Sequence, residues 1–491
     1  MRLALPSLLF ALALVDSSAK TWLAVSPDPQ LGNCLAPLAE HRESQGLETS
    51  ISIGTVAESL GKLSAPPDYL LIVGDDQLVP ARRGHQYRWL STQNEAFAAD
   101  PLFSDLDGDG LPEFPVGRIP SNSPEVIRAV VRKIIAYERR DLGVQDLNLP
   151  IWSGTPAYGK LLDESADWLL MSTIDKHLPK WAQPWLISAN PNNSLNGWPE
   201  EQSSLFNQQI QKGATLTAMM GHGSTDLFLS MIGPVTPRGR NDIVYTNADA
   251  RSLSSIDQLS PPLVIFACDC GNFADRERQS LAATLLLGSG GPVATIAATT
   301  ESHPLTNFYS SIALMEALRR ADTDRVGDLW LAAQREALGM RKPLIERMLK
   351  NVEGALEVEI DIPKLKRDQV QMYAYLGDPA LAIALPRELE VDVEKDADGD
   401  SWSWRAEKPP GAETLIVQHQ PVGKPLRTKP AGADRVQSLA LFQQRNDQFA
   451  YRTLTKIPST GDWEGQISTR GDLRLITISG SQIRVATRRL R

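Results

Sequence analysis

Short apolar runs, each closed by glycine and polar residues, recur through the first 385 positions of the chain. In the N-terminal part they occupy residues 21–25, 47–53 and 69–73, and they alternate with helical patterns at 37–44 and 124–139. Strands that alternate with helices predict right-handed crossovers and a parallel sheet. We therefore expect an α/β fold.

Two later apolar runs each end in a reactive side chain. Residues 214–220 lead into Gly221-His222-Gly223-Ser224, and residues 262–267 lead into Cys268-Asp269-Cys270-Gly271. Ligands of open α/β sheets bind beyond the carboxyl ends of the strands. We therefore expect His222 and Cys268 to lie at one edge of the sheet, where a Cys and a His form a nucleophile and its proton carrier. Another strand is predicted at 292–298, with helices at 275–287, 308–319 and 326–338.

The pattern changes from residue 386 onward. Short alternating runs at 389–393, 414–417 and 473–478 are separated by clusters of Gly, Pro and Asp. This texture is typical of a small antiparallel β-sandwich of about a hundred residues.

Length and charge narrow the class of protein. A chain of 491 residues is expected to form two or three domains. Its 42% hydrophobic and 22% charged residues are ordinary for a soluble protein, and its net charge of −9 argues against nucleic acid as the main partner.

The N-terminus has the pattern of a secretory signal peptide. A basic start and an apolar core at 3–15 precede Ser17-Ser18-Ala19, which supplies small residues for cleavage near Ala19. The alternative is a buried N-terminal strand or helix. No later stretch is long and apolar enough to be transmembrane. We expect a secreted or periplasmic protein, and no large pro-domain, because the first expected strand follows the signal directly.

The three cysteines are too few for a disulfide scaffold. Cys268 and Cys270 are too close in sequence for an unstrained bridge. Cys34 lies well beyond the apolar core of the signal, so we interpret it as an ordinary buried cysteine and not as a lipidation site.

The motifs Gly221-His222-Gly223-Ser224 and Ala267-Cys268-x-x-Gly271-Asn272-Phe273 resemble those of the gingipain-type cysteine peptidases, peptidase family C25 of the caspase-like clan. The resemblance extends over about residues 21–385 and includes further matches at 71–75, 105–110, 116–118 and 375–381. It implies a catalytic unit of two α/β subdomains with mostly parallel sheets, followed by an immunoglobulin-like β-sandwich. The expected boundaries are 1–19 for the signal, 20–145 and 146–385 for the subdomains, and 386–491 for the sandwich.

The resemblance also implies roles for residues. Cys268 would attack the scissile carbonyl and His222 would protonate the leaving amine. The backbone N–H groups of Cys268 and Gly223 would form the oxyanion hole. Thr299, Thr300 and Glu301 would help to form the substrate pocket, where Glu301 either receives a basic side chain or faces solvent. The helix expected from about residue 275 would help to lower the pKa of the thiol.

Three other readings of the cysteines remain open. Cys268 could be a buried structural residue, and Cys270 could be the nucleophile in its place. The two cysteines could also form a metal site with His222, although the C-x₂₋₄-C spacing of structural zinc is absent.

Asp105, Asp107 and Asp109 precede Gly110 at the alternating spacing of calcium ligands. They predict a structural calcium ion, with a solvated acidic turn as the alternative, and residues 396–400 repeat the spacing. The catalytic chemistry itself requires no cofactor.

The patterns and the resemblance together imply a secreted cysteine endopeptidase that hydrolyses protein or peptide substrates through a Cys-His dyad and an acyl-enzyme. One alternative is a sortase-like transpeptidase that acts on exported proteins. The other is a non-catalytic surface or adhesion protein that retains the fold.

Overall fold

The computed structural model describes residues 19–87, 94–155, 171–190, 192–231, 235–236, 239–240, 243–253, 260–347, 361–397, 399–421 and 434–491. The expected signal peptide, apart from Ala19, lies outside the described residues. No helix within these ranges is both long enough and apolar enough to cross a membrane.

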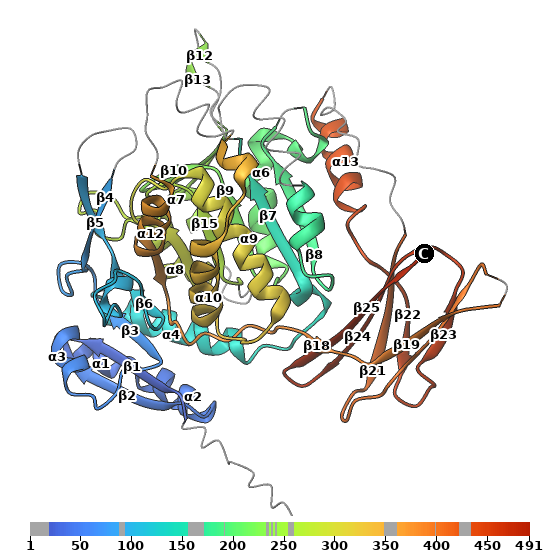
Figure 1. Cartoon of the computed structure of the whole chain (residues 1–491), viewed down its shortest axis with the longest axis horizontal. Coiled ribbons are helices and arrows are strands. Elements are labelled where there is room, and N and C mark those ends of the chain that lie inside the picture. The colour runs from blue at the N-terminus through green and yellow to red at the C-terminus, as the bar shows by residue number, and fades with distance from the viewer. Residues whose placement is uncertain are drawn as a thin grey trace, which may run out of the picture.

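One ten-stranded sheet runs through both expected subdomains (Figure 1). Its strands, in spatial order, are β2 (Glu48–Ile53), β1 (Thr21–Ser26), β3 (Tyr69–Val73), β6 (Val116–Ile119), β17 (Tyr373–Leu376), β16 (Thr295–Ala298), β15 (Leu263–Phe266), β9 (Thr217–Met220), β7 (Asn148–Ser153) and β8 (Gln183–Ser188). All neighbours are parallel except β16 and β17, which pair antiparallel with Ile296 opposite Tyr375. The two halves of the sheet therefore run in opposite directions, and the strands of both subdomains share one sheet.

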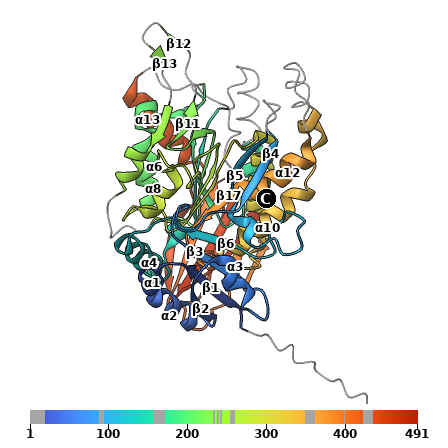
Figure 2. The same ribbon diagram turned by 90° about the vertical axis from the view of Figure 1, so that its left-hand side faces the viewer.

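Helices cover both faces of this sheet (Figure 2). One face carries α1 (Pro29–Asn33), α2 (Ala36–Ser44), α4 (Pro124–Glu138), α6 (Gln202–Gln211) and α8 (Leu281–Leu287), with α7 (Asn247–Arg251) packed against α6 and α8. The other carries α3 (Val56–Gly61), α10 (Val326–Gly339) and α12 (Ile362–Met372), with α9 (Pro304–Arg320) packed against α10 and α12. The central strands are apolar along their whole length because both of their faces are buried.

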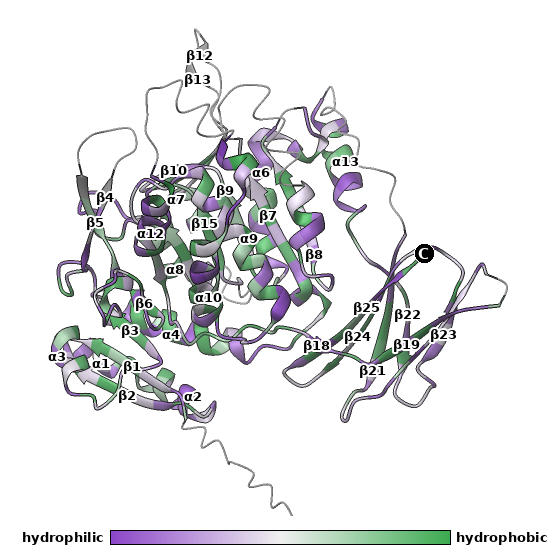
Figure 3. Cartoon of the chain, viewed as in Figure 1, coloured by the Kyte–Doolittle hydropathy of each residue, from purple (hydrophilic) through white to green (hydrophobic). Residues whose placement is uncertain are grey.

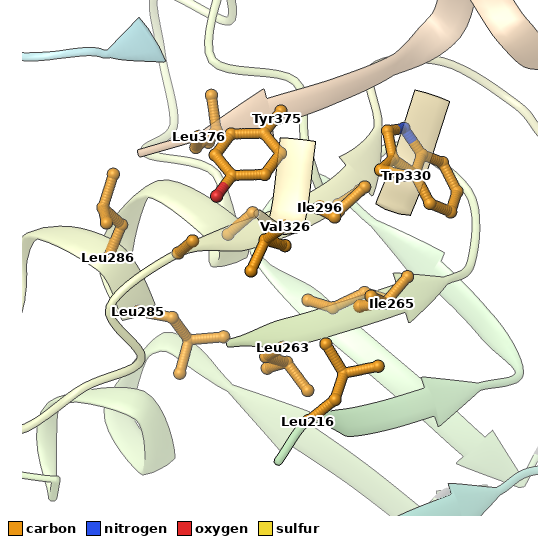
Figure 4. Packing of buried hydrophobic residues seen from close by; sticks show 14 of the residues in the cluster. Leu216, Leu263, Ile265, Leu285, Leu286, Ile296, Val326, Trp330, Tyr375 and Leu376 are labelled. Atoms are coloured by element: carbon orange, nitrogen blue, oxygen red, sulfur yellow. The ribbon is translucent and has the colours of Figure 1, made fainter. Parts of the chain in front are cut away.

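Figure 4 shows the middle of this core, where Leu263 and Ile265 of β15 lie near Ile296 of β16 and Leu285 of α8. These side chains are at most 1% exposed. Burial of one such side chain contributes about 1.5–3 kcal/mol. Figure 3 shows the contrast between hydrophobic β15 and helices that carry both hydrophilic and hydrophobic residues. The apolar runs that predicted the strands thus form the packed centre of the molecule.

The predicted strands and helices of the catalytic unit are confirmed in type and order, but several starts were wrong. Helix α9 begins four residues before its predicted start, and β9 and β16 each begin three residues after theirs. The helix predicted from residue 275 begins only at Leu281, where Ser280 caps it by accepting a hydrogen bond from Ala283 N. Asp275 instead accepts hydrogen bonds from the backbone N–H groups of Glu277 and Arg278, which stabilises a turn. Helix α8 is therefore short and starts well beyond Cys268.

Several smaller sheets lie outside the ten-stranded sheet. They are a hairpin of β4 (Arg83–Tyr87) and β5 (Asn94–Ala98), a three-stranded sheet of β10 (His222–Ser224), β11 (Leu227–Met231) and β14 (Ile243–Thr246), and a pair of β12 (Val235–Thr236) and β13 (Gly239–Arg240). The 3₁₀ helices within the described ranges are η1 (Asp100–Phe103), η2 (Val144–Leu147), η3 (Ser194–Asn196) and η4 (Pro199–Glu201).

The C-terminal region forms two sheets that share a hydrophobic cluster, which includes Trp402, Trp404 and Trp463. The larger sheet contains β18 (Arg387–Glu388), β25 (Gln482–Leu490), β24 (Gly471–Ser479), β21 (Thr414–Pro421) and β22 (Arg452–Pro458). The smaller one contains β19 (Val391–Lys395), β20 (Trp402–Ala406) and β23 (Glu464–Ile467). The prediction of an antiparallel sandwich was wrong for one strand pair, because β18 and β25 are parallel. It also did not include helix α13 (Arg435–Asn446), which is inserted between β21 and β22.

Helix α13 reaches from this C-terminal region to the edge of the ten-stranded sheet (Figure 1). The Asn446 amide donates to the carbonyl oxygen of Leu186 and accepts from its N–H, at 3.1 and 2.7 Å. Phe442 meets Trp185 edge to face, with ring centroids 5.5 Å apart. Edge strand β8 therefore has backbone groups satisfied by a side chain of α13.

Candidate active site

His222 and Cys268 leave neighbouring parallel strands at the same level of the sheet. Strands β9 and β15 pair with Met220 opposite Phe266, and each reactive residue lies two positions farther along. Gly221 N donates to Phe266 O at 3.1 Å, which continues the pairing past the strand ends. The side chains predicted to act together are thus brought to one edge, as the apolar runs indicated.

The half-buried imidazole of His222 is held by a backbone group. Its Nε2 atom lies 3.1 Å from the carbonyl oxygen of Thr155, two residues beyond β7. A carbonyl oxygen only accepts, so Nε2 carries the proton in this hydrogen bond and Nδ1 is the basic ring nitrogen. Sequence reasoning missed Thr155, because any residue type can supply a carbonyl oxygen at this position.

The Cys268 thiol is half-buried and faces the loop that follows β16. Its Sγ atom donates to the carbonyl oxygen of Ser302 at 3.5 Å, and the Ser302 hydroxyl lies 4.0 Å from the same sulfur. Burial raises the pKa of Cys268 to about 11, and the negative charges of Glu301 and Asp269 act in the same direction, whereas Ser302 opposes them. The expectation that a helix N-terminus would lower this pKa was wrong, because α8 begins at Leu281.

The loop after Cys268 is a tight turn with a strained residue at its centre. Asp269 has a φ of 57°, and Cys270 N donates to Cys268 O at 2.7 Å. A left-handed backbone at a residue other than glycine costs about 1–2 kcal/mol. Hydrogen bonds from Asp269 N to Thr300 O and from Gly271 N to Ala298 O hold the turn against β16 and the loop beyond it.

Cys270 lies beneath the strand that carries His222. Its side chain is fully buried, its Sγ atom donates to Leu227 O at 3.4 Å, and burial raises its pKa well above the ordinary value. A Cβ atom on Gly223 would lie 2.5 Å from Cys270 Sγ and 2.6 Å from Cys268 O. The close approach of the two loops therefore requires glycine at position 223.

The three residues expected in the substrate pocket differ in their surroundings. Thr299 is buried and donates to the carbonyl oxygen of Ala98 at 2.6 Å. Thr300 is also buried, and Glu301 is half-buried. Of the three, Glu301 alone offers exposed surface, and the role of this segment in a pocket stays a prediction.

The acidic loop gathers more carboxylates than its sequence motif predicted. Ligand atoms of Asp105, Asp107, Asp109 and Glu113 all lie within 4.8 Å of one another. Glu113 was missed because it stands at the ninth position counted from Asp105, outside the D-x-D-x-D pattern. The loop also contacts α12, where Gln371 donates to Gly110 O at 2.9 Å.

The other expected metal sites have less support among the described residues. The acidic loop is the one group of three or more metal-binding side chains found within those residues, and it contains neither His222 nor Cys268 nor Cys270. In the second acidic motif, Asp396 accepts hydrogen bonds from Ser401, Ser403 and Gln466, and residue 398 lies outside the described ranges.

Comparisons with known proteins agree with the motifs. The model of peptidase family C25 matches residues 17–384. No curated protein matches the chain. Solved structures that resemble it include the Arg-specific cysteine proteinase gingipain R (RgpB), with 13% identity, a TM-score of 0.55 and coverage of 96% of this chain and 98% of that one.

Two further structures give the same result. A protein described only as a protease has 13% identity and a TM-score of 0.57, with coverage of 96% and 97%. The complex of the pro- and mature domains of Porphyromonas gingivalis RgpB has 14% identity and a TM-score of 0.54, with coverage of 96% and 100%. At this level of identity the likeness shows a shared fold.

Proposed function

The chain belongs to peptidase family C25 and is a cysteine peptidase, and from this premise we propose that it is a secreted or periplasmic endopeptidase whose catalytic dyad is Cys268 and His222. The observation that carries the proposal is the register of β9 and β15, which brings both residues off adjacent strand ends at the same level. The half-buried thiol of Cys268, beside the fully buried thiol of Cys270, supports Cys268 as the nucleophile.

The reaction begins with the transfer of the Cys268 proton to Nδ1 of His222. The thiol is the stable form in the free protein, since burial and two nearby carboxylates raise its pKa to about 11. Transfer to the imidazole creates an ion pair, and the imidazolium stabilises the thiolate beside it. The Thr155 carbonyl supports the imidazolium by accepting the hydrogen bond from Nε2.

The thiolate then attacks the scissile carbonyl carbon, and the carbonyl π electrons move to the oxygen. The backbone N–H groups of Cys268 and Gly223 are the proposed donors to that oxyanion. Collapse of the intermediate breaks the C–N bond, and the leaving amine takes the proton from His222. Water, deprotonated by His222, hydrolyses the thioester and regenerates the thiol.

Three further features belong to the proposal. The N-terminal signal pattern supports export, and the two C-terminal sheets with their common tryptophan cluster support an immunoglobulin-like module. The four carboxylates of the acidic loop support a structural calcium ion.

Cleavage of a peptide library by the wild type, Cys268→Ala and His222→Ala tests the proposal. We expect internal cleavage by the wild type and a loss of at least a thousandfold in kcat/KM in both variants. Hydrolysis that persists in Cys268→Ala would contradict the assignment. Addition of an amine nucleophile separates the alternatives, because a transpeptidase yields the amide in place of the acid, whereas a non-catalytic protein yields no product.

A further inference from the structure

A buried network of polar side chains lies behind Cys268, on the side away from His222. Its members are Ser302, Asn307 of α9, Gln369 of α12 and Tyr373 of β17, and they are 3%, 5%, 3% and 0% exposed. Polar groups buried to this extent are costly unless every donor and acceptor finds a partner. The hydrogen bonds within the network therefore fix the orientation of each side chain.

Asn307 is the centre of the network. Its Oδ1 atom accepts from the Tyr373 hydroxyl at 2.7 Å and from Gln369 Nε2 at 2.9 Å. These two donors direct the amide so that Nδ2 faces Ser302 Oγ, at 2.9 Å. An amide nitrogen only donates, so the Ser302 oxygen accepts at this contact and its own proton must point to a different acceptor.

Two acceptors are available for the Ser302 proton. One is the Tyr373 oxygen, where the Ser302 hydroxyl acts against the rise in pKa that burial causes, and the other is Cys268 Sγ at 4.0 Å. A thiolate is a stronger acceptor than a neutral phenol oxygen, because hydrogen bonds to charged groups are stronger than those between neutral groups. Rotation about the Ser302 Cβ–Oγ bond therefore moves the proton toward the sulfur once Cys268 ionises.

The other surroundings of Cys268 disfavour the negative charge. Burial opposes it, as do Glu301 in the loop after β16 and Asp269 in the cysteine loop. Cys270 and Tyr373 are buried, and burial raises the pKa of each, so both remain neutral. His222 approaches from β10 as the proton acceptor. On the side of β16, both the backbone and the hydroxyl of Ser302 lower the pKa of Cys268, and the backbone contributes more.

We propose that the Ser302 hydroxyl is a further catalytic group, which donates a hydrogen bond to the Cys268 thiolate, and that Asn307 is a positioning residue that holds this hydroxyl in place. The inference rests on the proposed function, in which Cys268 is the nucleophile. The proton of Cys268 still passes to His222, and the Ser302 proton stays on its oxygen and changes only its acceptor.

The pH dependence of Cys268 alkylation by iodoacetamide tests the proposal without a peptidase assay. Peptide mapping by mass spectrometry follows Cys268 alone, in the wild type, Ser302→Ala, Ser302→Thr and Asn307→Ala. The Ser302→Ala variant loses a hydrogen bond to a charged group. We therefore expect the pH at which Cys268 reaches half of its maximal alkylation rate to rise by about one unit. We expect a smaller rise in Asn307→Ala and the wild-type profile in Ser302→Thr.

The matched control is Ser311→Ala, because the Ser311 hydroxyl lies on the same helix as Asn307 and donates to the carbonyl oxygen of Phe308 at 2.8 Å, within α9 itself. It should keep the wild-type profile. With a peptide substrate, Ser302→Ala should lower kcat about tenfold at neutral pH and leave KM little changed.

An alkylation profile of folded Ser302→Ala that coincides with the wild type would overturn the inference. If the melting curve shows that Ser302→Ala does not fold, Asn307→Ala decides in its place, and an unshifted profile there would contradict the inference. Failure of the proposed function has a different signature, since Cys268 would then show the predicted alkylation shifts while peptide hydrolysis survived in Cys268→Ala.

Discussion

The thiols of Cys268 and Cys270 are separated by a single residue but differ in their exposure to solvent. The strained turn at Asp269 separates them, so that Cys268 keeps an exposed edge while Cys270 is sealed beneath Gly223. The sequence predicted that His222 and Cys268 would lie at one edge of the sheet, because glycine-closed apolar runs mark strand ends, and the pairing of β9 with β15 places them there. It could not predict Thr155 or Ser302, since a backbone carbonyl has no residue signature and the Ser302 network joins elements far apart in the chain.

Substitution of Gly223 tests the oxyanion hole at the scale of a single atom. In Gly223→Ala the new Cβ meets Cys270 Sγ at 2.5 Å and the backbone oxygen of Cys268 at 2.6 Å, so the two loops must separate. Displacement of one oxyanion donor lowers kcat by about 10²–10³-fold. Steady-state kinetics should show this loss. Gly339→Ala is the control, because a Cβ there meets no atom within 4 Å and activity should be unchanged. Wild-type kcat in Gly223→Ala would exclude the proposed hole.

At the scale of elements, the strongly periodic segments were predicted correctly, whereas a helix start that competes with a local turn was not. Helix α4 lies within one residue of its predicted end, because Ser123 and Pro124 mark its start and a clear apolar face runs along it. The start of α8 was missed because the Asp275 turn competes with the helix. Helix α13 was missed because its anchor, Asn446, acts on a strand 260 positions earlier.

The acidic loop gives a prediction at this scale. Four carboxylates within 4.8 Å repel one another, and a bound calcium ion would remove that repulsion and stabilise the folded state by mass action. We expect EDTA to lower the melting temperature by a few degrees and excess calcium to restore it. Asp107→Ala and Glu113→Gln should flatten the response, whereas Asp392→Ala on exposed β19 should retain it. If neither EDTA nor millimolar calcium changes the melting temperature of the wild type, the loop is an acidic turn that binds no calcium.

At the scale of the whole molecule, a buried ionic network connects helices α2 and α4 with the residues that follow β17, the last strand of the ten-stranded sheet in chain order. Arg42 of α2 bonds to Glu138 of α4 at 2.7 Å and to Asp378, just after β17, at 2.8 Å. Glu138 also accepts from His41 and from the backbone of Ala382. The sequence predicted neither this network nor the antiparallel pairing of β16 and β17, because pairing partners across a sheet leave no local pattern.

This network makes stability depend on acid pH. Burial raises the pKa of Glu138, but Arg42 and the hydrogen bonds outweigh burial and lower it to about 2, from an ordinary value near 4.5. Because the folded pKa is the lower one, the contribution is fully present above about pH 4.5 and is lost as the pH falls toward 2. Melting temperatures measured from pH 6 to pH 2.5 should therefore fall more steeply for the wild type than for Glu138→Gln. Parallel curves would contradict the assignment.

The most direct test of the whole account is the identity of the residue that forms a covalent bond with substrate. A panel of peptidyl acyloxymethyl ketones with different P1 residues traps a nucleophilic thiolate as a thioether, which intact-mass measurement and peptide mapping locate. We predict a single label on Cys268 in the wild type and in Cys270→Ala, and no label in Cys268→Ala. A label on Cys270, or hydrolysis of peptides by a protein that never labels at Cys268, would contradict the account.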